Sequence, residues 1–214
     1  MRFYGYFRSS SAYRCRIALN LKGIDYEFVP VHLRRGGGEQ HLEDYLELNP
    51  QGLVPVLEVG DFRLSQSLSI IEWLDETHPD PPLLPGDADA RARARSFAQA
   101  IACDTHPLQN LRVLDYLRNE LLQDEEHVIN WCRHWVQRGL AACEAVLARH
   151  NHGQSCCFGA TPGLADICLV PQVFSADRFG VDLSAMPHVM RITRSCEQHH
   201  AFTEAHPARQ PDSE

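Results

Sequence analysis

A proline-rich segment at residues 79–85 (PDPPLLP) divides the chain into two parts with different hydrophobic patterns. Prolines restrict the backbone and stiffen a linker, so such a segment is typical of a domain boundary. Before it, short apolar runs with strand character alternate with helical patterns, whereas only helical patterns follow it. We therefore predict an α/β domain over residues 1–80 and an all-helical domain over residues 86–214.

The first part begins with the order strand, helix, strand. Residues 2–7 are rich in aromatic side chains and residues 26–32 alternate apolar and polar positions, so both are predicted to be strands. Between them, residues 13–22 place apolar side chains on one face of a helix that ends at Gly23. Because a crossover helix makes the two strands parallel, this segment is a predicted βαβ unit.

A second unit with the order helix, strand, strand, helix follows. A short helix is expected at residues 40–48, and two apolar runs around the turn Gly60-Asp61 predict a β-hairpin. Ser67 is a favourable N-cap for a helix at residues 68–78. A βαβ unit followed by an αββα unit predicts a thioredoxin-like N-terminal domain.

The second part is predicted to contain helices only. Apolar residues recur at helical spacing in four segments: residues 87–122, 124–149, 164–179 and 187–200. Pro107 is expected to break or kink the first of them. The polar tail at residues 207–214 is expected to be mobile.

The composition argues against several classes of function. A net charge of −8 is unlike the basic surface of a nucleic-acid-binding protein. We recognise neither a signal peptide nor an apolar run long enough to span a membrane, so we expect a cytoplasmic protein. The eight cysteines show no metal-ligand spacing, and even the adjacent pair Cys156-Cys157 suits packing, so we expect neither a disulfide framework nor a metal site.

Three consecutive serines, Ser9, Ser10 and Ser11, stand where the first predicted strand meets the first helix. A thioredoxin-like domain places its reactive group here, because the free N–H groups and partial positive charge of a helix start favour an anion. Serine cannot exchange disulfides, which disfavours a thiol oxidoreductase, but its hydroxyl can donate a hydrogen bond to a bound thiolate. Such a bond, worth about 1.5–3 kcal/mol, can together with the helix start lower a thiol pKa by about two units. N-capping of the helix is the alternative role of these serines.

Two further segments suit a short anionic peptide that carries a thiol. Val54-Pro55 lies after a turn and before a strand, which predicts a cis peptide bond and a Val54 backbone open to pairing with an extended peptide. Gln66 and Ser67 precede a helix, where an amide side chain and a helix start can bind an amine and a carboxylate. Each segment also fits ordinary turn or cap chemistry, so only the combination is specific.

Five segments resemble zeta-class glutathione transferases, and the likeness covers nearly the whole chain. They are residues 8–19, 49–55, 66–72, 106–114 and 165–173. The resemblance implies the glutathione transferase fold, an α/β thioredoxin-like N-terminal domain plus an all-α C-terminal domain, and a homodimer. The sequence departs from the family pattern at Ser11, often Cys, at Ala12, often Ser, and at Gly163, usually the Ser or Thr of a capping box.

The resemblance also implies glutathione as the cofactor. Its binding residues would be Ser9, Ser10, Gln40, Val54, Pro55, Gln66, Ser67, His106 and Asn110. His106 and Asn110 would reach in from the helical domain or from the partner subunit's side. Because the family often has Cys where Ser11 stands, Ser9, Ser10 and Ser11 all remain catalytic candidates for the thiolate donor.

Bacterial members of the class include isomerases of maleylacetoacetate and of maleylpyruvate. The implied reaction is cis–trans isomerisation of a small dicarboxylate: the glutathione thiolate adds to the double bond, the bond rotates, and the thiolate leaves. Arg8, Arg112 and Arg178 are candidates for binding the substrate carboxylates, whereas Arg14 and Arg16 are expected to serve structure. The sequence does not separate the two substrates. Two alternatives stay open: conjugation or dehalogenation of small α-halo acids, and non-catalytic binding of apolar ligands.

Overall fold

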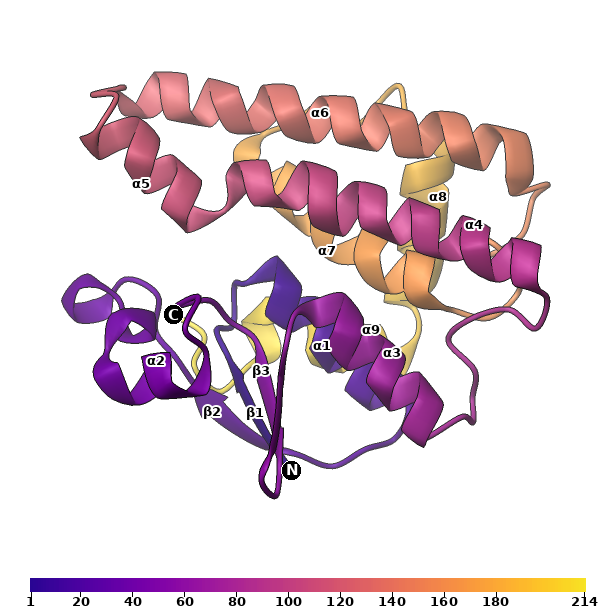
Figure 1. Ribbon diagram of the computed structural model, residues 1–214. Helices are drawn as coiled ribbons and strands as arrows, with labels where there is room; N and C mark the ends of the chain where they lie inside the picture. Colours follow the sequence, from indigo (N-terminus) through magenta and orange to yellow (C-terminus); the bar gives the residue numbers. More distant parts are fainter. The chain divides into compact units, whose positions relative to one another are not determined.

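The computed structural model describes residues 1–214 as two compact units (Figure 1). The first unit comprises Met1–Pro82 together with His199–Glu214, and the second comprises Leu83–Gln198. The division after Pro82 lies inside the proline-rich segment. The C-terminal end differs from our expectation, because residues 199–214 join the α/β unit and not the helical one. A helical pattern shows that a segment has an apolar face, but not which core that face packs against.

The first unit is built on a mixed four-stranded sheet with the order β2-β1-β3-β4. The strands are β1 (Arg2–Gly5), β2 (Glu27–Pro30), β3 (Val56–Val59) and β4 (Phe62–Ser65). β1 and β2 are parallel, as the crossover predicted, while β3 is antiparallel to both β1 and β4. The thioredoxin-like arrangement is therefore confirmed.

The helices of this unit are α1 (Ser10–Leu21), α2 (Glu43–Leu48), α3 (Ser67–Thr77) and α9 (His200–Ala205). Short 3₁₀ turns lie at Arg35–Gly37, Glu39–His41 and Pro207–Arg209. Most of α1 is buried, because it packs against both α3 and α9, and Figure 1 shows α9 beside it. A helix that is enclosed on several sides presents no strongly polar face.

Two expectations about this unit were wrong. Ser67 does not cap α3: it is the first helical residue, Gln66 occupies the cap position, and the Ser67 hydroxyl accepts a hydrogen bond from Arg14 Nη1 at 2.9 Å. The tail is also not free, because Pro207 and Gln210 are buried. In both cases a contact from a distant part of the chain overrides the local pattern.

The second unit consists of α4 (Ala88–Gln99), α5 (Leu111–Asn119), α6 (Glu125–His150), α7 (Leu164–Phe179) and α8 (Pro187–Glu197). A π-helical turn, Ala100–Thr105, and a 3₁₀ turn, His106–Gln109, separate α4 from α5. The expected break at Pro107 is therefore present. α7 is buried along nearly its whole length and contacts α4, α6 and α8. None of these helices combines the length and apolar character needed to cross a membrane.

Gly163, one of the departures from the family pattern, has a steric reason. It is the N-cap of α7, and a Cβ at this position would lie 2.7 Å from the carbonyl oxygen of Leu83. That same oxygen accepts a hydrogen bond from Leu164 N–H at 2.8 Å. A serine or threonine cap would require this backbone approach to open.

Candidate functional site

Residues 8–11, called the serine turn here, follow the end of β1 and enter α1. Gly5 closes the strand at a crowded point, because a Cβ there would lie 3.1–3.2 Å from the side chains of Phe28, Ala12 and Phe3. The backbone then turns, with Ser9 N–H donating to the carbonyl of Tyr6 at 3.0 Å. A close strand-to-helix approach therefore fixes where α1 starts.

The three serines differ in what they can reach. Ser9 is the N-cap of α1, and its hydroxyl oxygen accepts a hydrogen bond from Ala12 N–H at 3.3 Å. A hydroxyl that accepts one bond keeps its own proton for donation. Ser10 is buried, with 6% of its surface exposed, whereas Ser9 and Ser11 are half-buried. No acidic side chain lies in the first turn of α1, so its partial positive charge is left for an external anion.

The second segment, Val54-Pro55, has the predicted cis peptide bond. The turn before it is held by two donors, since Asn49 Nδ2 and the Tyr45 hydroxyl both donate to the carbonyl of Leu53, at 2.7 and 2.8 Å. Burial raises the pKa of Tyr45, which keeps that hydroxyl protonated as a donor. The backbone N–H and C=O of Val54 make no hydrogen bond within the chain, which leaves both available to an extended peptide.

The third segment is the start of α3. Gln66 is exposed, has a φ of 72°, and donates from Nε2 to Gln51 Oε1 at 2.9 Å. Neither an acidic residue nor a capping side chain occupies this helix start. Gln40 lies elsewhere in the unit, buried, with Nε2 donating to the carbonyl of Leu33 at 3.4 Å. The α3 start is thus a second open anion position, while Gln40 is largely enclosed.

The remaining candidates belong to different places. Arg8 lies in the serine turn, where its guanidinium is 5.4 Å from the ring centre of Phe7. In the second unit, His106 opens the 3₁₀ turn and Asn110 caps α5 by accepting from Arg112 N–H at 3.2 Å. Arg178 is exposed in the last turn of α7, 4.7 Å from the ring centre of Phe179. His106, Asn110 and Arg112 therefore share one short segment, and Arg178 lies on another helix.

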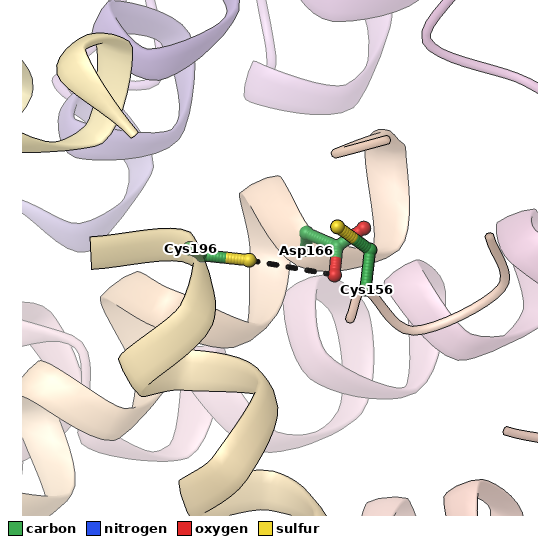
Figure 2. A group of neighbouring side chains, drawn as sticks. All are labelled: Cys156, Asp166 and Cys196. Carbon is green, nitrogen blue, oxygen red and sulfur yellow. Dashed lines mark hydrogen bonds between the residues drawn. The ribbon is translucent and has the colours of Figure 1, made fainter. Parts of the chain in front are cut away.

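The structure also brings together a group that the sequence did not reveal. The thiols of Cys156 and Cys196 and the carboxylate of Asp166 lie within 4.8 Å of one another, all three buried (Figure 2). Asp166 lies on α7 and Cys196 on α8, 30 positions later, so no local spacing could have indicated the group.

The carboxylate of this group already has a structural role. Asp166 accepts from Gly163 N–H at 3.0 Å and from Cys157 N–H at 2.8 Å, and the Cys196 thiol donates to it at 3.7 Å. Burial raises the pKa of Asp166, although these donors oppose that effect. We assign Asp166, the third residue of α7, as the carboxylate that accepts from the N–H of the N-cap Gly163, and the thiols as its buried surroundings. All eight cysteines are free thiols and only Cys103 is exposed, in line with their expected packing role.

Comparison with known proteins places this arrangement in a family. Residues 3–82 match the family described as "Glutathione S-transferase, N-terminal domain". Maleylacetoacetate isomerase of Pseudomonas aeruginosa is 50% identical, over 100% of this chain and 99% of its own length.

Two solved structures are similar over the full length of both chains. The holo structure of a maleylpyruvate isomerase, described as a bacterial zeta-class glutathione S-transferase, has a TM-score of 0.97 and 47% identity. Maleylacetoacetate isomerase from Methylobacterium extorquens AM1, with bound malonate and glutathione, has a TM-score of 0.95 and 42% identity. The chain therefore belongs to the zeta class of the glutathione S-transferase family.

Proposed function

We propose that this protein is a glutathione-dependent cis–trans isomerase that converts maleylacetoacetate to fumarylacetoacetate. The observation that carries the proposal is the start of α1, where half-buried serine hydroxyls line a helix N-terminus with no acidic side chain of its own. The full-length likeness to an isomerase of this substrate supports it. When bound, glutathione supplies a thiolate that adds to the cis double bond and leaves after the bond has rotated.

The residues of the first unit fit such a peptide. Glutathione carries two carboxylates, an amine and a thiol, and the unit offers two open helix starts and an unpaired backbone edge at Val54. Val54, with Pro55, would pair with the extended peptide, while Gln66 and Ser67 would bind its γ-glutamyl end. Gln40 would contribute from the 3₁₀ turn Glu39–His41.

Ser9 and Ser11 are the better candidates for the thiolate donor, since Ser10 is buried. A charge-assisted hydrogen bond is worth about 1.5–3 kcal/mol and a helix start about 0.3–1 kcal/mol. Together they would lower a thiol pKa from about 8.5 to the range of about 6 to 7, because one pKa unit corresponds to about 1.4 kcal/mol. A thiol in that range is ionised to about one half or more at neutral pH.

The substrate carboxylates need cations, and the arginines supply them. Arg8 lies in the serine turn, over the ring of Phe7, and its Nη2 donates to the Tyr6 hydroxyl at 3.4 Å. The other N–H groups of its guanidinium would donate to a planar carboxylate. Arg112 and Arg178 are both exposed in the second unit, and we propose them for the far end of the substrate. His106 and Asn110 are proposed to contact glutathione from that unit.

Alanine variants of the serines test the proposal. Ser9→Ala and Ser11→Ala should raise the pKa of the bound thiol, followed by thiolate absorbance, and the more important of the two should lower kcat about 10- to 100-fold. Ser184→Ala, an exposed serine in the loop before α8, is the matched control. If both serine variants isomerise at the rate of the control, the serine turn is not the thiolate site.

Maleylpyruvate is the second candidate substrate, because a maleylpyruvate isomerase is similar to this chain at nearly the same identity. Loss of the cis-dicarboxylate absorbance, followed for both compounds with and without glutathione, ranks them. A constant glutathione concentration indicates isomerisation, whereas its consumption with an α-halo acid indicates conjugation or dehalogenation. A protein that only binds apolar ligands would turn over none of these compounds.

We further propose a homodimer in the cytoplasm, on the basis of the family. Light scattering coupled to size-exclusion chromatography measures the assembly state. A mass of about 48 kDa, twice the chain's 24.2 kDa, supports the dimer, and a mass equal to the single chain contradicts it.

A further inference from the structure

The C-terminal tail contacts the segment that leads into the serine turn. Phe7 N–H donates to Asp212 Oδ2 at 2.9 Å, joining residues 205 positions apart in the sequence. Phe7 lies between the end of β1 and Ser9, and its neighbour Tyr6 accepts from Ser9 N–H. The tail therefore holds the backbone two residues before the first candidate catalytic serine.

The carbonyl side of the same segment is held by Arg16. Its Nη2 donates to the carbonyl of Phe7 at 2.8 Å, its Nη1 to that of Tyr6 at 3.4 Å, and its Nε to that of Ala205 at 3.0 Å. The guanidinium is fully buried, and burial lowers its pKa to about 10 while the charge of Asp212 opposes that shift. Arg16 and Asp212 thus bind the two polar groups of the Phe7 backbone, its carbonyl and its N–H.

Hydrogen bonds within the tail order its backbone, so the position of Asp212 is fixed. Gln210 is buried, and its Nε2 donates to the carbonyls of Glu204 and His206 at 2.8 and 3.0 Å. Ser213 N–H then donates to the Gln210 carbonyl at 3.0 Å, which forms a turn around Asp212. Because these contacts already order the backbone at Asp212, its hydrogen bond to Phe7 costs little further backbone entropy.

A second tail contact is weaker. His32 Nδ1 accepts from Arg35 N–H at 2.7 Å, so in the neutral ring Nε2 carries the proton and donates to Glu214 Oε1 at 2.8 Å. More than half of the Glu214 side chain is exposed, and exposed pairs of this kind contribute little. Asp212 is therefore the contact that matters.

From these contacts we infer that Asp212 is a positioning residue, which fixes the Tyr6–Phe7 backbone and thereby the aim of Ser9 and Ser11 at a bound thiol. Its catalytic consequence rests on the proposed glutathione-dependent reaction. The hydrogen bond to the charged Asp212 fixes the orientation of the Phe7 N–H and of the Tyr6–Phe7 peptide group that contains it. Ser9 N–H donates to the carbonyl of that same peptide group, so the position of the serine turn depends on it.

The test compares Asp212→Ala, Asp212→Asn and Ser213→Ala in the full-length protein. Asp212→Ala should raise the pKa of bound glutathione and lower kcat by about three- to tenfold with little change in the KM for the dicarboxylate. Asp212→Asn keeps an oxygen that can accept from Phe7 N–H, so it should restore activity to within about twofold. Ser213→Ala, in an exposed side chain of the same turn, should match the unmodified protein in both measurements.

Hydrogen exchange in the absence of ligand separates this inference from the proposed function. Amides of residues 6–12 should exchange faster in Asp212→Ala than in Ser213→Ala, with unchanged circular dichroism. Equal exchange in the two variants, or equal thiol pKa and kcat in a protein that does isomerise, overturns the inference. If the unmodified protein neither binds glutathione nor isomerises either compound, the proposed function fails, and the exchange result alone decides whether the tail positions the turn.

Discussion

The helices α1 and α7 begin in opposite ways. At α7 the chain supplies its own anion, because the buried Asp166 carboxylate accepts backbone N–H groups at Gly163 and Cys157. At α1 the cap is Ser9, and the first turn has no acidic residue. Both helix starts favour negative charge, but α7 satisfies this preference with its own carboxylate, whereas α1 has none in its first turn.

Other helices of the chain extend the comparison. α4 and α6 are capped by Asp87 and Asp124, and each has an acidic residue in its first turn. α8 takes its carboxylate from another helix, since Glu144 on α6 accepts from the N–H groups of His188 and Val189. The α1, α3 and α5 starts have no acidic residue in the first turn, and they are the ones that carry or adjoin candidate site residues. α9 also lacks an acidic residue in its first turn, and its cap is the ring of His199, so a missing carboxylate alone does not identify a ligand site.

The largest expected effect is at α7. Asp166→Ala should cost about 3 kcal/mol or more of unfolding free energy, because the buried N–H of Cys157 and the partly buried N–H of Gly163 would lose their acceptor. Urea denaturation measures the change, with Asp182→Ala, an exposed carboxylate that accepts from Ser184 N–H at 2.9 Å, as the control. A loss no greater than that of the control would show that α7 does not depend on its own anion.

An intermediate effect is expected when α1 is given the anion it lacks. Ser11→Asp should stabilise the helix by about 0.3–1 kcal/mol through the helix dipole and weaken glutathione binding about tenfold through like-charge repulsion. Thermal unfolding and calorimetric titration measure the two changes, and Ser11→Asn separates charge from shape. Unchanged affinity in the aspartate variant would contradict the view that this helix start receives the thiolate.

The smallest effect on stability is expected at α8, where the carboxylate at the helix start is that of Glu144 on α6. Burial alone would raise the pKa of Glu144, but hydrogen bonds from Val189 and His188 outweigh it and lower the pKa below its usual 4.5. A lowered carboxyl pKa in the folded state adds stability above the unfolded pKa, and that stability disappears as the pH falls through the folded value.

Glu144→Gln should therefore be less stable by under about 1 kcal/mol at neutral pH, with the difference shrinking in acid. Urea midpoints across the acid range, with Glu47→Gln on the exposed face of α2 as the control, provide the measurement. A difference that stays constant with pH would mean that packing, and not charge, is responsible.

Much of the fold followed from local patterns. The strand and helix order, the break at Pro107 and the cis bond at Val54-Pro55 each depend on a few neighbouring residues, and the structure has all of them. Where a distant side chain intervened, the local reading failed. Serine is a residue type favoured at the N-cap, but the Ser67 hydroxyl accepts a hydrogen bond from Arg14 and the cap position falls on Gln66.

The candidate site divides in the same way. The positions of the serine turn, Val54-Pro55 and the α3 start could be predicted because caps, turns and helix starts have signatures within a few residues. The difference between Ser10 and its neighbours could not, because burial depends on what packs against the helix. The tail was expected to be mobile, since nothing in residues 207–214 reveals that Asp212 meets Phe7.

The sequence by itself determined which strands and main helices form and which helices carry an acidic residue in their own first turn, because residues next to each other in the chain decide those properties. Only the tertiary structure decided that residues 199–214 belong to the α/β unit, that Asp166 lies among thiols, and that Asp212 of the tail binds the Phe7 backbone beside the serine turn. Those contacts join residues tens to hundreds of positions apart, and their energy exists only once the two segments are packed together.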